Sequence, residues 1–320
     1  MSKQNQSPRD LGSHLKQALL SVLASLCLAA PLAAAEPPEL LIRADDIGMN
    51  HAVNSAMREL IRAGLPFSAT VMVPCPWFPE AAEILRDNPQ VSVGIHLTLN
   101  SEWSVYRWGP VLGSSEVPSL VDEIGYFFHT ADQLFENDMR LEEVEAELRA
   151  QIEQALRAGL KLDFLDYHML TAARTPELRG VVEKLAGEFK LGLSHYFGEP
   201  SMSLWDVAPE RKLTTLLDFV EQVQPGVPTL LVMHLGQDTP EMNALVDANW
   251  AVDPYRVAKH RSEELAALTS PAFLRATSAR SIRFVTYRDM VQRYGLDSMQ
   301  SPGAAIGYSM DRAAEADGGQ

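Results

Sequence analysis

The sequence predicts an α/β protein, namely a distorted (β/α) barrel of mostly parallel strands with helices on the outside. Two observations favour this fold class. Short apolar segments alternate with amphipathic helical segments over about 250 residues, which is typical of parallel strands joined by crossover helices. No repeat of fixed period is present in the chain, which argues against a repeat architecture.

The first strand and helix illustrate how the elements are assigned. Residues 40–45 form an apolar run that ends in polar residues, as a buried strand does. The helix that follows carries apolar residues at helical spacing, is capped by Asn50 or a neighbour, and ends at Gly64. The other expected strands are 67–73, 91–99, 164–169, 191–197, 229–235 and 282–287. The other expected helices are 77–87, 139–158, 175–189, 208–222 and 254–268.

Residues 100–138 interrupt this alternation. Periodicity disappears there, and aromatic residues are crowded among Gly, Pro and Ser. They are Trp103, Tyr106, Trp108, Tyr126, Phe127 and Phe128. The segment is too long for a connection and too aromatic for a disordered linker, so we expect a folded excursion. Its rings form either a platform for a sugar or a local mini-core, and the sequence leaves both interpretations open.

The amino-terminal segment has the pattern of a secretory signal peptide. Lys3, Arg9 and Lys16 precede an apolar run from Ala18 to Ala35 that ends in small residues, as a signal peptidase requires. We therefore expect residues 1–35 to be cleaved. The mature protein would be exported, periplasmic or secreted, with no stable membrane insertion after cleavage. An uncleaved anchor helix is the alternative.

The remainder is expected to be one domain, residues 36–300, followed by a disordered tail, residues 301–320. After cleavage Cys75 is the only cysteine, so we expect no internal disulfide and a buried thiol. Acidic residues outnumber basic ones 42 to 27, a formal net charge of -15. A surface this negative repels phosphate backbones and argues against a nucleic-acid partner. The oligomeric state is left open, a homo-oligomer included.

Titratable residues stand where four of the expected strands end. They belong to the segments Asp45-Asp46, Gly94-Ile95-His96, Asp166-Tyr167-His168 and Met233-His234-Leu235-Gly236. Because the carboxyl ends of parallel strands meet on one face of a barrel, we expect these side chains to lie together. One Asp and two His are sufficient protein ligands for a catalytic metal. Two adjacent carboxylates on an extended chain point to different sides, so we expect Asp45 and Asp46 to divide their roles.

These motifs resemble, in order, those of the YdjC/ChbG family of carbohydrate deacetylases. The matching segments are Leu41–Gly48, Val93–Leu99, Asp166–His168, His234–Gly236 and Arg261–Leu265. The resemblance extends from about residue 39 to residue 292. It implies a distorted β/α barrel that holds one divalent metal cation, Zn or Mg. It also implies hydrolysis of the N-acetyl group of an amino sugar, such as a chitooligosaccharide.

The resemblance assigns a role to each matching residue. Asp46, His96 and His168 would be the metal ligands. Asp45 would be the general base that acts on the attacking water, and His234 is the best candidate for the acid that protonates the departing amine. An amide needs help at both ends, because it is a poor electrophile with a poor leaving group, and this set supplies both.

Two arginines are possible supporting residues. Arg43 lies two residues before Asp45 and shares a strand face with it. It either holds Asp45 ionised or only pairs with it structurally. Arg261 either contacts substrate or forms an ion pair with Glu264 on its own helix, and the spacing favours the ion pair.

The sequence departs from the family pattern at two positions. Leu170 stands where many members have a second histidine, and Leu235 replaces the proline of a His-Pro-Gly turn. These departures bear on the substrate subsite beside the metal and on the loop at His234, but not on the ligand set.

Two other functions stay open. One is a metal hydrolase on the same barrel that cleaves another amide or an ester. The other is a carbohydrate-binding protein without activity, which the presence of both Asp45 and Asp46 disfavours because binding would need only one. The negative charge argues against phosphorylated or strongly anionic substrates and suits neutral or amine-bearing glycans.

Overall fold

The computed structural model describes residues 1–2, 36–249 and 257–302. The chain divides into two units, Met1–Glu36 and Pro37–Gln320, and the fold is that of the second unit. Most of the predicted signal peptide and nearly all of the predicted tail lie outside the described residues, so both stay predictions. Within the described residues, no helix combines the length and the apolar character needed to cross a membrane.

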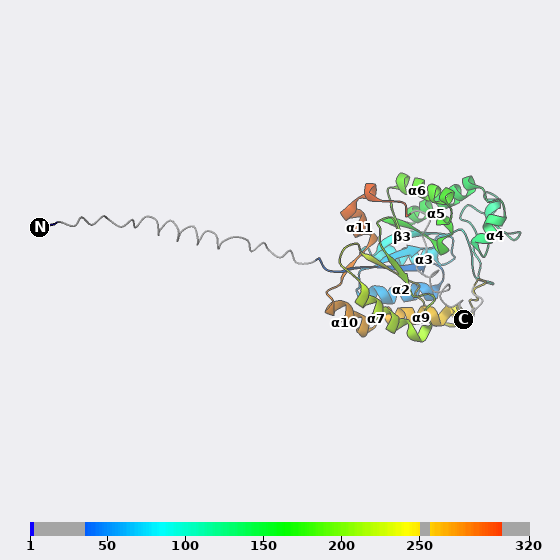
Figure 1. The fold of residues 1–320 in the computed structure, drawn as a ribbon. Helices are drawn as coiled ribbons and strands as arrows, with labels where there is room; N and C mark the ends of the chain where they lie inside the picture. Colours follow the sequence, from blue (N-terminus) through cyan, green and yellow to red (C-terminus); the bar gives the residue numbers. More distant parts are fainter. Residues whose placement is uncertain (3–35, 250–256, 303–320) are drawn as a thin grey trace, which may run out of the picture. The chain divides into compact units, whose positions relative to one another are not determined.

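A curled parallel sheet forms a half-barrel at the centre of this unit (Figure 1). Its strands are β1 (Glu39–Ile47), β2 (Ser68–Val71), β3 (Ser92–Leu97), β4 (Phe164–Tyr167), β5 (Gly192–Leu193), β6 (Ser201–Ser203) and β7 (Thr229–Met233). They lie in the order β5-β4-β3-β2-β1-β7-β6, and every neighbouring pair is parallel. A further strand, β8 (Arg283–Val285), pairs with the start of β1. The predicted fold class, a distorted (β/α) barrel, is confirmed.

Helices connect the strands and cover the outside of the sheet. They are α2 (His51–Ala63), α3 (Phe78–Asp87), α4 (Ala131–Glu136), α5 (Leu141–Arg157), α6 (Pro176–Phe189), α7 (Lys212–Gln222), α8 (Pro240–Asn243), α9 (Val257–Leu268), α10 (Pro271–Ala279) and α11 (Tyr287–Tyr294). Figure 1 shows α5 and α6 together on one side of the sheet, and α2, α7 and α9 on the other. Short 3-10 segments add η1 (Pro118–Leu120), η2 (His168–Ala173), η3 (Pro209–Arg211) and η4 (Leu296–Ser298).

The predicted elements are present, and most of them except β1 are shorter than predicted. In α2, the Asn50 side chain accepts a hydrogen bond from the Val53 amide at 2.9 Å, and Gly64 ends the helix at φ 76°. Several elements were not predicted, among them β6, α4, α8, α10 and α11. Strand β6 has three residues, too few for an alternating pattern, and α10 lies in a stretch without a clear apolar period. The predicted helix at 254–268 is described from Val257 onward.

The aromatic excursion is folded, as expected. Trp103, Trp108 and Phe127 are buried in the main core, and Val121 pairs with Phe127 in an antiparallel bridge. These three rings therefore belong to the core of the domain and not to a separate local mini-core. Trp103 is the one of the six aromatic residues that also lines the pocket described below.

A small apolar cluster fills the amino-terminal end of the barrel interior. It consists of Leu41, Phe164, Leu230, Val232, Val285, Tyr287 and Met290. Gly94 leaves room for it, because a Cβ at that position would lie 2.5 Å from the Phe164 ring. Cys75 is free and buried, as predicted. The interior is thus apolar where the strands begin, and its polar residues lie toward the carboxyl ends of the strands.

Candidate active site

Three predicted metal ligands converge where β1, β3 and β4 end. Asp46 Oδ1 lies 3.2 Å from His96 Nε2 and 3.5 Å from His168 Nδ1. One ligand atom from each residue lies within 4.8 Å of those from the other two, and all three side chains are buried. The two imidazole rings meet edge to face with centroids 5.1 Å apart. The structure therefore brings together the trio that the family resemblance implies.

The backbone at Asp46 explains how two adjacent carboxylates reach one pocket. Asp46 has φ 71°, a left-handed conformation that is uncommon for a residue other than glycine and is often found at functional sites. The pairing of β1 with β2 shifts register between Ala44 and Ile47. The backbone is thus not extended at Asp46, as the sequence-based expectation assumed, and both Asp45 and Asp46 line the pocket.

The trio fits a divalent cation. Asp46 Oδ1 is buried and has no hydrogen-bond partner among the described residues, and an unpaired buried carboxylate oxygen is costly. One carboxylate and two imidazoles are a donor set typical of zinc, and other divalent metals also use these ligands. A second group, Asp45, His96 and Asp166, has similar spacing. It is a poor cation site because the Arg43 guanidinium already bonds both of its carboxylates.

The charges of the trio depend strongly on one another. Burial alone would raise the pKa of Asp46, but the charge of Arg261 and the two histidine rings beside Oδ1 hold that pKa well below its usual range. Burial would lower the pKa of the imidazoles, yet the surrounding carboxylates raise it to about 9 for His96 and about 10 for His168. In the absence of a cation these carboxylates therefore retain protons on the two rings.

Each ligand histidine has a carboxylate on its outer nitrogen. Asp166 Oδ2 lies 2.8 Å from His96 Nδ1, and His168 Nε2 donates a hydrogen bond to Glu102 at 2.8 Å. Such outer carboxylates orient metal-binding imidazoles and increase their basicity. Neither acid was predicted from the sequence to have a role. Asp166 was recognisable from its place at a strand end opposite His96, whereas Glu102 lies in the aromatic excursion, where no periodic pattern marks it.

Arg43 fixes Asp45 through two hydrogen bonds. Its Nε and Nη2 each donate to one oxygen of Asp45 at 2.8 Å, and Thr70 donates a further hydrogen bond to Asp45 at 2.8 Å. Arg43 Nη1 donates to Ser194 at 2.6 Å and also pairs with Asp166. The Arg43 side chain is fully buried, so this two-point contact fixes the orientation of Asp45.

His234 lies at the end of β7, beside Asp45. Its Nε2 is 3.9 Å from Asp45 Oδ2, and its Nδ1 is buried without a hydrogen-bond partner among the described residues. Burial lowers its pKa to about 4, which the charges of Asp46 and Asp45 only partly oppose. The His234 amide donates to Glu264 at 2.6 Å, and Glu264 is paired with buried Lys212 at 2.7 Å.

Arg261 departs from the sequence expectation. Its Nη2 donates to Asp46 Oδ2 at 2.6 Å, and the favoured ion pair with Glu264 is wrong because Glu264 instead binds Lys212 and the His234 amide. The Arg261 stem passes over Gly236, where a Cβ would lie 3.0 Å from the Arg261 Cβ. The glycine of the His-Leu-Gly turn thus admits the arginine, and Leu235 beside it is buried in the core.

These residues line a pocket of about 270 Å³. Its walls contain Asp45, Asp46, His96, Glu102, Trp103, Tyr167, His168, Met169, Leu170, Ser203, Trp205, Asp206, His234, Asp247 and Arg261. Leu170, one of the two departures from the family pattern, is therefore part of the pocket. Trp205 was not singled out from the sequence, because it follows a strand of only three residues. It packs edge to face with His234 at a centroid distance of 5.1 Å.

The fold and the site define a class of protein: a parallel half-barrel with a buried Asp-His-His group beside an Asp–His pair. The comparisons with known proteins then give the family. A family model described as YdjC-like protein matches residues 39–279. The chain belongs to this family, and the resemblance inferred from the motifs is confirmed.

Several curated relatives carry the name carbohydrate deacetylase. One from Enterococcus faecalis is 37% identical over 156 residues, which cover 48% of this chain and 57% of the relative. One from Geobacillus stearothermophilus is 30% identical over 261 residues, which cover 79% of this chain and 98% of the relative. The match to the first relative thus spans little more than half of its length. The predicted enzyme class, a carbohydrate deacetylase, agrees with these names.

A solved structure supports the fold. A protein of Enterococcus faecalis V583, described as a candidate cellobiose-phosphate cleavage protein, is 27% identical. It superposes with a TM-score of 0.66 over 80% of this chain and 99% of its own. The half-barrel is therefore shared over nearly the whole length of that neighbour.

Proposed function

We propose that this protein is a metal-dependent deacetylase that removes the N-acetyl group of an amino sugar of the chitooligosaccharide type. One observation carries the proposal. The trio Asp46, His96 and His168 shares a pocket with the pair Asp45 and His234, in a family whose curated members are named carbohydrate deacetylases.

Asp46, His96 and His168 would hold the cation. When bound there, a divalent metal polarises a carbonyl oxygen and makes water more acidic. Asp166 and Glu102 keep Nε2 of His96 and Nδ1 of His168 turned toward Asp46, through their contacts with the opposite ring nitrogens. The same fold thereby fixes both imidazoles before any cation arrives.

Asp45 is suited to act as the general base. It is buried, and its orientation is set by Arg43 and Thr70. A base held in place loses little entropy when it takes a proton from the attacking water. Its Oδ2 faces His234 Nε2 at 3.9 Å, so the base and the candidate acid lie on adjacent sides of the pocket.

His234 is suited to return a proton to the leaving amine. With a pKa of about 4, it is neutral at neutral pH, so it must first receive the proton that Asp45 removes from water. Once protonated, an imidazole of such low pKa is a strong acid toward an amine. Asp45 and His234 therefore form one relay, in which the proton enters at the carboxylate and leaves from the ring.

The charge of the pocket limits the substrate. Its lining includes the carboxylates of Asp45, Asp46, Glu102, Asp206 and Asp247, against a single arginine, Arg261. Even with a divalent cation present, the excess is negative, so phosphorylated sugars are disfavoured. Neutral N-acetylated glycans and glycans that also carry a free amine are the favoured substrates.

The proposal extends to the location of the protein. Lys3, Arg9 and Lys16 before the apolar run support export with cleavage of residues 1–35. Expression of the full chain, followed by cell fractionation and amino-terminal sequencing, tests this. A mature protein that starts at Glu36 outside the cytoplasm supports export, and an intact cytoplasmic chain contradicts it.

Acetate release from N-acetylglucosamine oligosaccharides tests the enzymatic proposal. Mature protein loaded with zinc or with magnesium should release acetate, and a chelator should stop the release. An O-acetylated sugar and an unrelated N-acetylated amide in the same panel distinguish the alternative hydrolases. Binding of the oligosaccharides without acetate release under any metal would instead favour the carbohydrate-binding protein.

A further inference from the structure

Arg261 has two buried hydrogen-bond donors that the protein does not use. Its Nε and Nη1 have no hydrogen-bond partner among the described residues, and the residue is 2% exposed. Buried donors in native structures nearly always have a partner, so each exception calls for an explanation. Because Arg261 lines the pocket, a ligand in the pocket can provide the missing acceptor.

The guanidinium is held firmly in place. Its Nη2 donates a hydrogen bond to Asp46 at 2.6 Å. The guanidinium carbon Cζ lies 5.3 Å from the ring centroid of Trp205 and 6.0 Å from that of Trp103. The close approach of the stem to Gly236 limits movement on the remaining side. An arginine fixed in this way presents its remaining N–H groups at defined positions, with little entropy left to lose on binding.

The position of Arg261 relative to Asp46 selects the acceptor. Asp46 Oδ2 receives the Arg261 bond, whereas Asp46 Oδ1 faces His96 and His168. A substrate oxygen drawn to the trio is therefore beside the guanidinium, which shares the same carboxylate. In an amide hydrolysis, the oxygen that gains negative charge is the acetyl oxygen, and donors aimed at it act most strongly in the transition state.

We propose that Arg261 is a catalytic residue that donates a hydrogen bond to the acetyl oxygen of the substrate as negative charge develops there. This inference rests on the proposed deacetylase function. The competing explanation is that Arg261 only holds Asp46 in place. The two explanations differ in what saturating metal does, since a residue that only holds a ligand becomes dispensable once the metal site is full.

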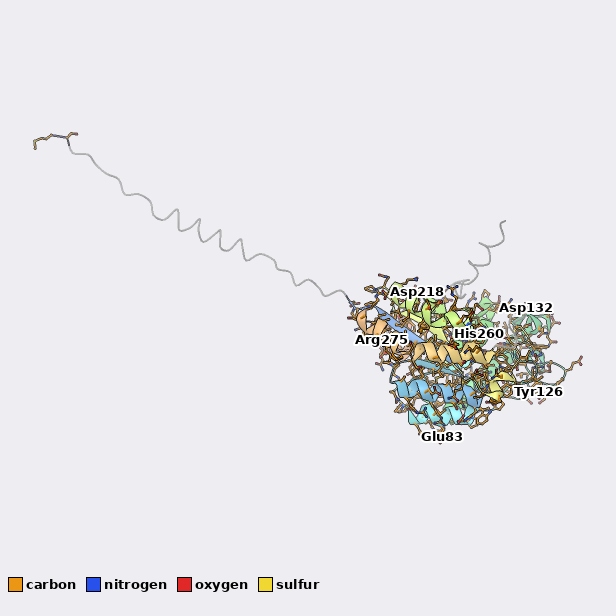
Figure 2. All side chains as sticks on the ribbon, turned by 90° about the horizontal axis from the view of Figure 1, so that it is seen from below. Glu83, Tyr126, Asp132, Asp218, His260 and Arg275 are labelled. Atoms are coloured by element: carbon orange, nitrogen blue, oxygen red, sulfur yellow. The ribbon has the colours of Figure 1, made fainter. Side chains whose placement is uncertain are left out.

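The test compares Arg261→Gln with Arg261→Lys, and uses Arg275→Gln as the control. Arg275 is exposed on α10 (Figure 2) and is not among the residues that line the pocket. At saturating metal, Arg261→Gln should lower kcat about a hundredfold with little change in KM. Arg261→Lys keeps the charge beside Asp46 but loses the forked donors, and it should stay at least tenfold below the native protein. The control should match the native protein.

A metal titration and an acetate titration complete the experiment. Metal affinity measured against a chromophoric chelator should be the same or tighter in Arg261→Gln, because a positive charge beside the site has been removed. Acetate, which is the product of the proposed hydrolysis, should bind the metal-loaded native protein at least tenfold more tightly than Arg261→Gln.

The outcomes separate the two proposals. A folded Arg261→Lys or Arg261→Gln that keeps kcat within about threefold of the native protein at saturating metal overturns the role of Arg261. If the native protein releases no acetate from any sugar, the deacetylase proposal fails. The acetate titration then still decides whether Arg261 binds an acceptor in the pocket, and equal acetate affinities in the native protein and Arg261→Gln reject it.

Discussion

Asp45 and Asp46 are neighbours in the chain, yet they occupy opposite kinds of environment. Both oxygens of Asp45 accept hydrogen bonds from Arg43, and Thr70 adds a third. Asp46 bonds Arg261 through one oxygen and leaves the other without a hydrogen-bond partner among the described residues. The difference shows how one strand end supplies two functions: a carboxylate with satisfied oxygens is positioned, and one with an open oxygen waits for a ligand.

Exchange of each carboxylate for an amide is expected to have the largest effect. Asp46→Asn should lose bound metal and, with it, nearly all acetate release. Asp45→Asn should keep bound metal near the native level and lower kcat about a thousandfold, because a general base is removed while the trio is intact. Elemental analysis and steady-state kinetics on the same samples check both. Metal loss in Asp45→Asn, or an active Asp45→Asn, would contradict the division of roles.

Removal of the charge beneath Asp45 should have the next largest effect. Arg43→Met leaves Asp45 and Asp166 buried without their cation, and an unpaired buried charge costs about 3–5 kcal/mol. The free energy of unfolding from urea titrations should fall by that amount. Arg43→Lys keeps the positive charge but loses the forked pair of donors, so its free energy of unfolding should lie between those of the native protein and Arg43→Met. A loss below about 1 kcal/mol in Arg43→Met would mean that Asp45 does not depend on this arginine.

Changes at Glu102 test the Asp46 side of the comparison, where the candidate metal ligands lie. Glu102→Ala removes the partner of His168 Nε2 and should weaken metal binding about tenfold to a hundredfold. Glu102→Gln keeps an acceptor without the charge and should have a smaller effect. Competition with a chelator gives both affinities. Glu116→Gln, an exposed position on the same excursion, is the control, and equal affinities for Glu102→Ala and this control would refute the role.

The smallest effect is expected at Glu39, a third acid on β1. Arg283 donates to it at 2.6 Å, and Arg293 does so at 2.6 and 3.0 Å. Burial would raise the pKa of Glu39, but the two arginines lower it below its ordinary value. Glu39→Gln should therefore cost about 1 kcal/mol at neutral pH, since both arginines are partly exposed.

The pH dependence of the Glu39 effect follows from the direction of its pKa shift. The stabilisation is complete above the unfolded-state pKa, near the ordinary value of 4.5. It disappears as the pH falls through the lower folded-state pKa. Thermal unfolding of both proteins between pH 7 and pH 3 checks this. If the difference in unfolding temperature between the native protein and Glu39→Gln stays constant over that range, Glu39 stabilises the protein by packing and not by charge.

The sequence predicted the strand ends well, because apolar runs that stop at polar residues are a local signal. Asp46, His96 and His168 were found in this way, and their meeting follows from the parallel order of β1, β3 and β4. The chemical roles given to them, and to Asp45 and His234, stay proposals. The expected ion pair of Arg261 with Glu264 failed because it relied on spacing along one helix, whereas both residues bond across the barrel.

Other features had no local signal. The left-handed backbone of Asp46 depends on a register shift between two strands. Glu102 and Trp205 reach the pocket from segments without a periodic pattern, and only the folding of distant parts brings them there. The sequence alone therefore does not predict where irregular segments lie in the tertiary structure.

The buried thiol of Cys75 can report on local opening of the barrel. In a protein that starts at Glu36, it is the only cysteine, and it is 3% exposed between two prolines. Burial raises its pKa well above the ordinary value for a thiol, so it is unreactive while its surroundings stay closed. The rate of labelling by a thiol reagent then measures how often this part of the core opens. The reagent should label Cys75 faster in Arg43→Met than in the native protein, and no further cysteine has to be introduced.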